Sequence, residues 1–437
     1  MGQVKGQRGR VKPTGQRGKR ITGSIVVYTI NLPEMILRKI KALAEEFTPE
    51  FTEVRRHLHA HPELSYQEFQ TSQYIQEKLS ELNISFEVKA TTGVVGFIEG
   101  KNPASRIVAL RADMDALPIR EENDVVYKSV NEGVMHACGH DVHMTCLLGA
   151  AKILVQTKAD WEGTVKLIFQ PGEEKNPGGA SLLIKDGVLA NPAPQCIFAL
   201  HVNPQLEVGN LSFRSGKVMA SADEIYITIK GKGGHAAAPH LTADTVLIAS
   251  HVVVGLQQII SRNNNPFSPS VLSVTSIQGG NTTNVIPTEV KLMGTFRAMD
   301  EGWRYKAHDL IYKHTNELVR AMGAEADVHI DVGYPAVVND EQLHLHAKHL
   351  AEEFMGTDAV QETEMRMGAE DFGFYSQLVP GCFFRLGTGN KAKGIIAGVH
   401  TPTFNIDESA IETGMAMMAV FGAATANKPA WSRVKFG

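Results

Sequence analysis

Short apolar segments that end in acidic or imidazole side chains recur along this chain and constrain its fold more than any other feature. The segments are residues 107–110, 164–169 and 196–200. The side chains that follow them are Asp113 and Asp115, Glu173 and Glu174, and His201. Helical patterns separate the segments, and buried strands alternating with helices are typical of a mixed, mostly parallel α/β sheet flanked by helices. Because ligands bind at the carboxyl edge of such sheets, we expect these side chains to meet there.

The run from Met135 to His143 adds a cysteine placed among three histidines. Thiolate, imidazole and carboxylate together suit first-row divalent metals. The candidate metal ligands are Cys138, His140, Glu174, His201 and His400. Five protein ligands are more than one tetrahedral catalytic ion uses, because an open position must remain. We therefore predict two divalent ions (Zn, Mn, Co or Ni) that share a bridging ligand, and the thiolate of Cys138 is a candidate for the bridge.

The tandem pair Glu173-Glu174 supplies more carboxylate than the ligand set needs. One glutamate is then a ligand, and the other is free to act as general base on a metal-bound water and to protonate the leaving amine afterwards. Asp115 is placed to orient a ligand imidazole. Together these residues predict a metal-assisted hydrolase of an amide or similar bond.

The length of 437 residues exceeds one ordinary hydrophobic core and predicts two domains. Residues 224–332 follow the order strand, helix, strand, strand, helix, strand, which is the split ferredoxin-like pattern. We predict a discontinuous catalytic domain over residues 35–215 and 333–437, with an inserted domain over residues 216–332. Residues 1–34 form a basic extension that we expect to be disordered.

Composition excludes several classes of protein. The first 23 residues hold seven lysines and arginines and no acidic residue, so the rest of the chain is more acidic than the net charge of −4 indicates. An acidic body disfavours nucleic acid as a partner, and the sequence shows no uninterrupted apolar run of the length a membrane span needs. The four cysteines are scattered without a disulfide spacing, which predicts a cytoplasmic location.

The chain resembles the metallopeptidase family M20, in the branch that includes hippurate hydrolase, N-acyl-amino-acid amidohydrolases and indole-acetyl-amino-acid hydrolases. The matching motifs lie in order over about residues 45–425. They are the segments 56–65, 113–118, 135–143, 170–174, 231–237, 283–287, 368–372 and 400–402. Other branches of the family have His-x-Asp where this chain has Asp113-Met114-Asp115, and His140 replaces the missing histidine.

The resemblance implies the five metal ligands named above, with Glu173 as the general base. It implies hydrolysis of the amide bond of N-acyl amino acids, a small-molecule substrate class, to a carboxylate and a free amino acid. It further implies that the inserted domain acts as a lid, that His235 and Asn284 contact the substrate from it, and that it joins a homodimer or a higher homo-oligomer.

Several alternatives stay open. Arg297 either holds the substrate carboxylate or is a solvated arginine at a strand end, and the roles of Glu370 and Asp371 are undecided. Cys138 could instead be a nucleophile activated by His136 or His140. Other functions on the same fold are a dipeptidase or carboxypeptidase-like peptide hydrolase, and a non-catalytic metal-binding protein.

Overall fold

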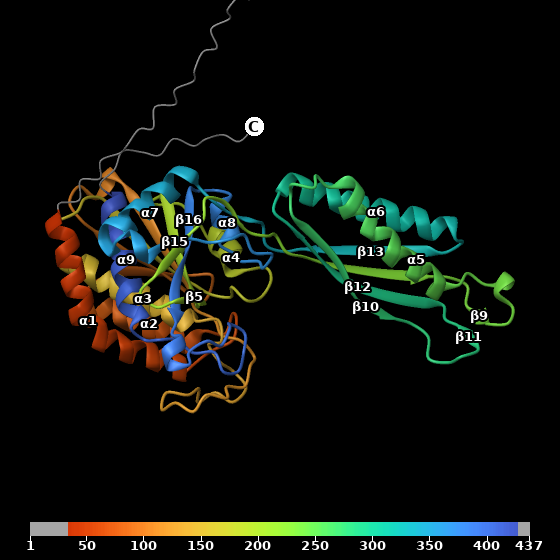
Figure 1. Ribbon diagram of the computed structural model, residues 1–437, viewed down its shortest axis with the longest axis horizontal. Helices are drawn as coiled ribbons and strands as arrows, with labels where there is room; N and C mark the ends of the chain where they lie inside the picture. Colours follow the sequence, from red (N-terminus) through yellow and green to blue (C-terminus); the bar gives the residue numbers. More distant parts are fainter. Residues whose placement is uncertain (1–33, 427–437) are drawn as a thin grey trace, which may run out of the picture. The chain divides into compact units, whose positions relative to one another are not determined.

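The computed structural model describes residues 34–426, which contain two main β-sheets (Figure 1). The predicted basic extension lies outside these residues, apart from Glu34, which begins the first helix. The predicted fold class, a mostly parallel sheet flanked by helices with an inserted ferredoxin-like domain, is confirmed.

The main sheet has eight strands in the order β1-β2-β4-β3-β5-β16-β6-β15. The central pairs β4–β3, β3–β5 and β5–β16 are parallel, whereas β1–β2, β2–β4 and β16–β6 are antiparallel. The strands are β1 (Ser85–Lys89), β2 (Gly93–Glu99), β3 (Ile107–Asp113), β4 (Thr164–Gln170), β5 (Cys196–Glu207), β6 (Leu211–Phe213), β15 (Val360–Glu362) and β16 (Gly381–Gly389). Because β3 has the later strands β4 and β5 on its two sides, the chain switches direction there, which is where such sheets bind ligands.

Helices cover both faces of the main sheet and make three layers (Figure 1). One face carries α1 (Glu34–Ala60), α2 (Phe69–Glu81), α3 (His140–Gln156), α7 (Glu341–Met355) and α9 (Ala410–Ala426). The other carries α4 (Gly179–Lys185) and α8 (Gly373–Ser376). Strands β3, β4 and β16 are consequently buried along their whole length.

Two of these helices show how the sequence specifies the layers. In α1 the buried residues recur at helical spacing, and the helix ends at Ala60, just before His61-Pro62, because a residue before proline avoids the helical region. The pattern of residues 142–155 predicts an amphipathic helix; the helix is confirmed as α3, but the prediction that only one face is buried is wrong. Nearly all of α3 is buried, because it packs between the sheet and both α1 and α9.

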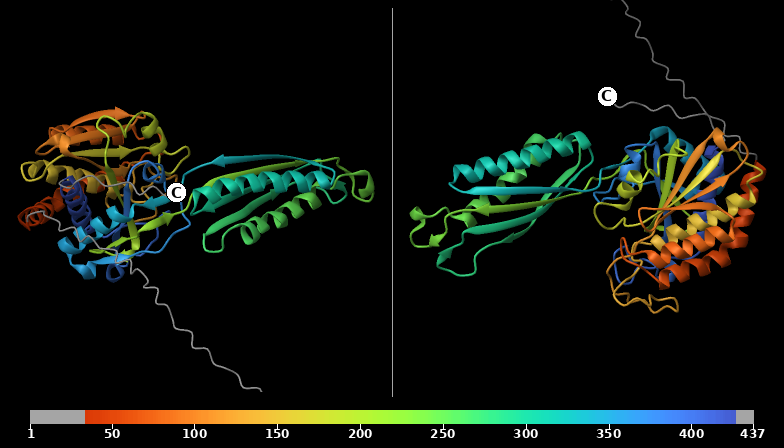
Figure 2. Two further views of the ribbon diagram at one scale, coloured as in Figure 1. Left: turned by 90° about the horizontal axis from the view of Figure 1, so that it is seen from above. Right: turned by 180° about the vertical axis from the view of Figure 1, so that it is seen from behind.

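The inserted domain has an antiparallel sheet in the order β10-β12-β8-β13, which is the ferredoxin-like order. Its elements are β8 (Asp223–Lys230), α5 (Thr245–Gln258), β10 (Ser270–Gln278), β12 (Glu289–Ala298), α6 (Glu301–Ala321) and β13 (Glu325–Val332). Helices α5 and α6 pack on the same face of this sheet (Figure 2). The side chains of Asp244 and Asp300 accept backbone N–H bonds at the start of these helices and so fix where each begins.

The segment Thr245–Asn263 is long and apolar enough to cross a membrane by length and composition. It comprises α5 and a short π-helical turn. Its buried side chains, including Ile248, Val252 and Leu256, belong to the core between the helices and the sheet of the inserted domain. We therefore interpret the segment as a core helix.

The chain leaves and re-enters the main sheet through adjacent segments. Strand β7 (Gly216–Met219) pairs with β14 (Val337–Asn339), and further along Asp223 lies opposite Val332 across the β8–β13 pair. The N–H of Ala222 also donates to the carbonyl of Tyr334 at 2.9 Å. We propose residues 216–332 as the inserted domain, with β7 at its edge.

A buried carboxylate, Asp223, organises the base of the inserted domain. It accepts hydrogen bonds from Arg304 (2.5 Å), His308 (2.8 Å) and the N–H of Gly333 (3.2 Å). Burial alone would raise the pKa of Asp223, but the bonds from His308 and Arg304 lower it below the ordinary value of 3.8. The ionised form is therefore favoured in the folded protein.

We expect Asp223→Asn to lower the free energy of unfolding at pH 7 by about 3 kcal/mol, because it leaves the buried Arg304 guanidinium without its counter-ion. A folded-state pKa below the unfolded value gives stability that is present above about pH 4 and is lost as the pH falls further. The difference between wild type and variant should accordingly shrink below pH 4 in urea titrations. Asp309→Asn is the control, because Asp309 is exposed on α6, the helix that carries Arg304. Equal stability of both variants and wild type at pH 7 would contradict the expectation.

Candidate active site

The predicted side chains meet at the carboxyl edge of β3, β4 and β5. Asp113 ends β3 and Asp115 follows it, while Glu173 and Glu174 follow β4. His201 lies inside β5, because that strand continues to Glu207, and its predicted position after the strand is wrong. The pairing of β3 with β5 ends at Arg111 and Ala199, so His201 is nevertheless past the paired stretch and at the same edge as the end of β3.

A tight turn brings the cysteine-histidine run to this edge. Gly139 has a φ of 85°, and a Cβ at this position would lie 2.5 Å from Val202, so the turn needs glycine. Helix α3 begins directly afterwards with His140. Cys138 and His140 are therefore held on opposite sides of one glycine and both point into the same buried space.

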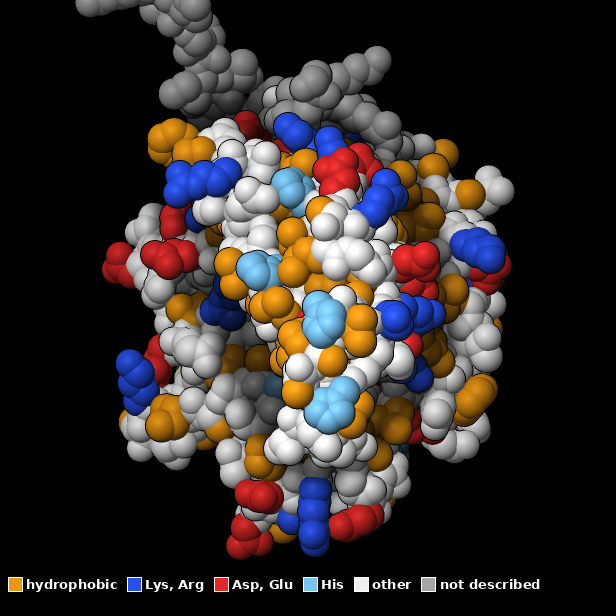
Figure 3. Space-filling view, turned by 90° about the vertical axis from the view of Figure 1, so that its right-hand side faces the viewer, with side chains coloured by type: hydrophobic (Ala, Val, Ile, Leu, Met, Phe, Trp, Pro, Cys, Tyr) orange, Lys and Arg blue, Asp and Glu red, His pale blue; other side chains and the backbone are white. Residues whose placement is uncertain are grey.

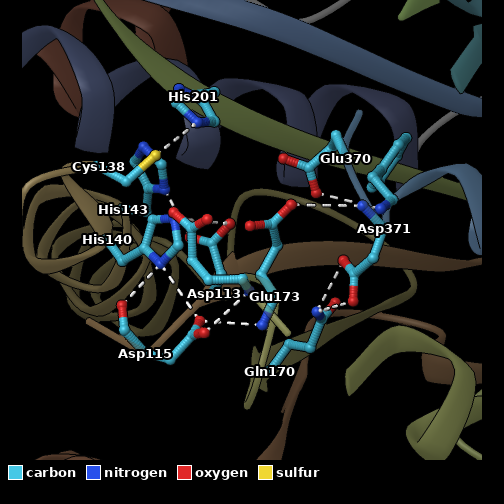
Figure 4. A network of polar contacts seen from close by, with 12 residues as sticks. Asp113, Asp115, Cys138, His140, His143, Gln170, Glu173, His201, Glu370 and Asp371 are labelled. Atoms are coloured by element: carbon cyan, nitrogen blue, oxygen red, sulfur yellow. Dashed lines mark hydrogen bonds and ion pairs between the residues drawn. The ribbon is translucent and has the colours of Figure 1, made fainter. Parts of the chain in front are cut away.

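The donor atoms of the five predicted ligands converge. Cys138 Sγ lies 3.5 Å from His201 Nε2 and 3.3 Å from His400 Nε2. Glu174 Oε1 lies 3.2 Å from His400 Nε2 and 3.9 Å from His140 Nε2. Figure 4 shows Cys138 and His201 turned toward each other, while Asp115 approaches His140 from the other side.

The hydrogen bonding of these residues fits metal ligation. His140 Nδ1–H donates to the carbonyl of Asp115 and His201 Nδ1–H to that of Val202, both at 2.8 Å, which leaves each Nε2 for a metal. Among the described residues, His140 Nε2 and Glu174 Oε1 are buried without a hydrogen-bond partner. Such atoms are costly unless a ligand satisfies them.

Electrostatics at the same place favour a cation. Burial raises the pKa of the Cys138 thiol well above its usual range, and the charges of Glu174 and Glu173 raise it further. Burial lowers the pKa of His140, but Asp113 and Asp115 outweigh this and raise it to about 10. Negative charge around the donor atoms contributes to both shifts, and divalent ions would neutralise it.

Asp115 holds a candidate ligand and the tandem glutamates together. Its carboxylate accepts the N–H of Glu173 at 3.0 Å, the N–H of Glu174 at 2.9 Å and the hydroxyl of Ser65 at 2.7 Å. Its Oδ1 also lies 3.3 Å from His140 Nδ1. Asp115 therefore acts through other residues, and its role as an orienting group stays a prediction with direct geometric support.

Glu173 is buried beside the ligand cluster but is itself bonded differently from Glu174. Its Oε1 accepts a long hydrogen bond, 3.4 Å, from the N–H of Asp371, and its backbone carbonyl accepts one from the hydroxyl of Tyr334 at 2.6 Å. Burial raises the pKa of the Glu173 carboxyl well above its usual range, followed by the charges of Glu370 and Glu174. A carboxyl that holds a proton readily suits a group that must accept one and return it.

The structure gives Glu370 and Asp371 a role that the sequence left undecided. Both accept hydrogen bonds from the buried guanidinium of Arg111, at 2.9 and 2.7 Å, and Arg111 also pairs with Asp113 at 2.6 Å. This ion-pair cluster joins β3 to the loop before α8, and Figure 4 shows Glu370 and Asp371 on the other side of Glu173 from Cys138 and His140. The sequence analysis missed Arg111, although a charged residue inside a buried strand was a usable signal.

Two further histidines of the segments 135–143 and 56–65, His143 and His59, make structural contacts. His143 donates to Asp113 at 2.5 Å and accepts the N–H of Val202 at 3.0 Å, which fixes β5 next to His201. His59 is buried between Asp141 at 2.8 Å and Glu121 at 3.1 Å. His136 is buried, and neither ring nitrogen has a hydrogen-bond partner in the described part of the chain.

The predicted substrate-binding residues all lie on the inserted domain. His235 is exposed on β9 (Gly234–His235), which pairs with β11 (Val285–Ile286) directly after Asn284. Asn284 is exposed, and its carbonyl accepts the N–H of Ala236 at 3.0 Å. Arg297 is partly buried near the end of β12, where its guanidinium donates to Thr295. The clusters of possible metal-ligand side chains found among residues 34–426 do not include His235.

A buried cluster of thiol, imidazole and carboxylate donors with a free carboxyl beside it defines a metal-dependent hydrolase. The model of peptidase family M20/M25/M40 matches residues 109–422, and the chain belongs to this family. The chain is thus a metal-dependent hydrolase of amide bonds, and the prediction of two divalent ions is confirmed at the level of the family.

The similar curated proteins include two amidohydrolases and a carboxypeptidase. The chain is 38% identical to thermostable carboxypeptidase 2 of Saccharolobus solfataricus, over 90% of this chain and 100% of that protein. It is 39% identical to IAA-amino acid hydrolase ILR1-like 4 of Arabidopsis thaliana, over 84% and 83% of the two chains. It is also 39% identical to N-acetyl-L-cysteine deacetylase of Bacillus subtilis, over 82% and 84%.

A solved structure supports the fold and the metal count. The Bacillus subtilis YXEP protein, described as a dinuclear metal binding peptidase from the M20 family, superposes with a TM-score of 0.76 at 32% identity. The match covers 87% of this chain and 99% of that one.

Proposed function

We propose that this protein hydrolyses N-acyl amino acids at the amide bond, releasing a carboxylate and a free amino acid. The observation that carries the proposal is the convergence of Cys138, His140, Glu174, His201 and His400 beside a separate buried carboxyl, Glu173. The names of the Arabidopsis and Bacillus relatives, an IAA-amino acid hydrolase and an N-acetyl-L-cysteine deacetylase, support this substrate class.

The chemistry divides between the ligands and the free carboxylate. Two divalent ions held by the five ligands would polarise the amide carbonyl and activate the attacking water. Glu173 accepts a proton from that water as the new C–O bond forms, and it returns the proton to the amide nitrogen as the C–N bond breaks. Asp115 keeps the imidazole of His140 and the backbone of Glu173 in fixed relative positions throughout.

Turnover of a substrate panel tests the proposal against its strongest rival. The panel contains N-acetyl, N-benzoyl and N-indoleacetyl amino acids, and also unblocked dipeptides and blocked peptides with a free carboxyl end. Each substrate is assayed with protein that has been reconstituted with Zn, Mn, Co or Ni. We expect the acylated amino acids to give the highest kcat/KM. Preference for blocked peptides would favour the carboxypeptidase alternative, which the Saccharolobus relative's name keeps in view.

The inserted domain completes the site in this proposal through His235 and Asn284. We expect His235→Ala to lower kcat by about 10²–10³-fold with metal content unchanged, because it removes a donor to the developing oxyanion or to the substrate carboxylate. His240→Ala, at a nearby exposed position, is the control. A normal kcat in His235→Ala would refute the role of this residue.

His235 and Asn284 lie at the end of the inserted sheet that is remote from its connections. Strand β8 runs from these connections to that end over eight residues, or roughly 25 Å at about 3.3 Å per residue. Mixing inactive His235→Ala with inactive Glu173→Gln protein therefore asks which copy supplies His235. Recovered activity would show that one subunit's inserted domain serves its partner's site, and no recovery would assign His235 to its own chain.

We also propose that the chain forms a homodimer or higher homo-oligomer through the inserted domain. Figure 3 shows hydrophobic and histidine side chains close together on the side of the molecule where this domain lies. The exposed apolar residues near α5, β9 and β11 include Leu241, Val246, Leu247, Val254 and Val285. Contiguous apolar surface of this kind is typical of protein interfaces.

The four free, buried cysteines favour a cytoplasmic location.

A further inference from the structure

Arg385 is a charged residue in the middle of a buried strand. It lies on β16 between Phe384 and Leu386, and only 4% of its surface is exposed. In the parallel pairing of β16 with β5, Arg385 is directly opposite the candidate ligand His201. The guanidinium lines the same cavity as Cys138 and His201.

This guanidinium has no carboxylate partner within the described residues. It hydrogen-bonds the sulfur of Met219 at 3.0 Å and lies 4.9 Å from the centre of the Phe383 ring. Two other buried arginines, Arg55 and Arg111, instead pair with carboxylates at 2.9 and 2.6 Å. A sulfur and an aromatic ring stabilise a guanidinium without neutralising it, so Arg385 keeps a full positive charge at the cavity wall.

A second arginine faces the same cavity. Arg366 is fixed through its backbone, where its N–H donates to the carbonyl of Val218 at 3.0 Å. Its exposed side chain reaches Asn203 at 3.4 Å and lines the cavity with Arg385. Burial and the charge of Arg366 lower the pKa of Arg385 to about 10, so the two cations repel one another.

The negative groups nearby are already engaged. Glu370 acts on Arg385 electrostatically but pairs with Arg111, and Glu173 is the proposed proton carrier. Divalent ions at the ligands would neutralise the carboxylates there, and Arg366 and Arg385 would then face no free negative group. An anion is the group that would satisfy both arginines.

We propose that Arg385, assisted by Arg366, binds a carboxylate of the substrate and so selects amide substrates that carry a carboxylate group. The assignment of this carboxylate site rests on the proposed function, the hydrolysis of N-acyl amino acids at the metal ligands. In an N-acyl amino acid the α-carboxylate is one carbon from the amide nitrogen, so an amide held at the metal ligands brings it close to the residue beside His201. The bidentate fork of arginine matches a carboxylate. A side-chain carboxylate is the other source of the same chemistry.

The test compares matched substrates in matched variants. The kcat/KM of wild type, Arg385→Gln, Arg385→Lys and Arg366→Gln is measured with the best N-acyl amino acid and with its primary amide, which lacks the α-carboxylate. We expect Arg385→Gln to lose about 10–100-fold on the acid and less than about 3-fold on the amide. Arg385→Lys should lie between, because it keeps the charge without the fork. Arg120→Gln, at an exposed surface ion pair, is the control.

The outcomes separate the two sources of carboxylate. If the loss appears with N-acetylglutamate but not with N-acetylglutamine, Arg385 reads the side chain, and if it appears with both, Arg385 reads the α-carboxylate. An equal loss on N-acetylglutamine and on its primary amide would overturn the proposal, because the second substrate has no carboxylate and the loss would show a structural role. Metal content and thermal unfolding identify a variant that fails to fold, in which case Arg366→Gln decides by the same acid-to-amide comparison.

A binding measurement keeps this proposal distinct from the proposed function. Calorimetric titration of hippurate into zinc-loaded Glu173→Gln protein is repeated with Arg385→Gln added. Weaker binding of hippurate, with no change for its primary amide, supports the carboxylate site even if wild type hydrolyses no member of the panel. Equal binding of hippurate and of N-acetylglutamate with and without Arg385 overturns it whatever the enzyme hydrolyses.

Discussion

Glu173→Gln protein should retain its divalent ions and lose at least about 10²–10⁴-fold in kcat. That factor is the usual contribution of one general acid–base group, and Glu173 serves both proton transfers in the proposed reaction. Glutamine keeps the size of the side chain, and the backbone bonds of residue 173 to Asp115 and Tyr334 need no carboxylate. Elemental analysis and steady-state kinetics on the same preparation measure the two properties together.

The neighbouring glutamate provides the matched control. Glu174→Gln should lose metal and, with it, activity, because Oε1 of Glu174 is the buried atom without a partner beside His140 and His400. If Glu173→Gln loses metal and Glu174→Gln retains it, the roles of the two residues are reversed.

Exhaustive chelation should abolish hydrolysis, and added Zn, Mn, Co or Ni should restore it. The reason is that the donor atoms of Cys138, His140 and His201 lie within one small buried space whose surrounding carboxylates favour a cation. Residual activity after dialysis against a strong chelator, with metal content checked by elemental analysis, measures any metal-independent route.

The same experiment decides whether Cys138 is a nucleophile. A thiolate that is coordinated to metal should resist alkylation in the loaded protein and react after chelation. Alkylation of Cys138 with metal bound, accompanied by loss of activity, would favour the nucleophile. Full activity in metal-free protein would refute the metal mechanism altogether.

The convergence of the candidate ligands could be predicted from the sequence, because each lies at a position that local patterning specifies. Glycine before His140 and strand ends before Asp115 and Glu173 are local features, and the edge of a parallel sheet brings them together. The position of His201 inside β5 was missed, since the length of a strand depends on its neighbours. Here β16 continues the pairing beyond the end of β3.

The charged interior was much harder to predict. Arg111 meets Glu370 and Asp371 across about 260 residues of chain, and Arg385 meets Met219 across 166. Sequence spacing carries no information about such pairs, so Arg385 and Arg111 were not recognised. The burial of α3 on nearly all sides was missed for a related reason, because α1 and α9, which cover it, come from opposite ends of the chain.

The inserted domain returns the chain to the place where it left. Asp223 and Val332 face each other across neighbouring strands, and Ala222 bonds to Tyr334 just outside them. A segment whose two ends touch can be gained, lost or exchanged without stretching the surrounding backbone. The hydrolytic centre and the domain that is proposed to complete it are therefore free to diverge separately, so that relatives with the same metal ligands can acquire different substrate ranges by changing one cassette.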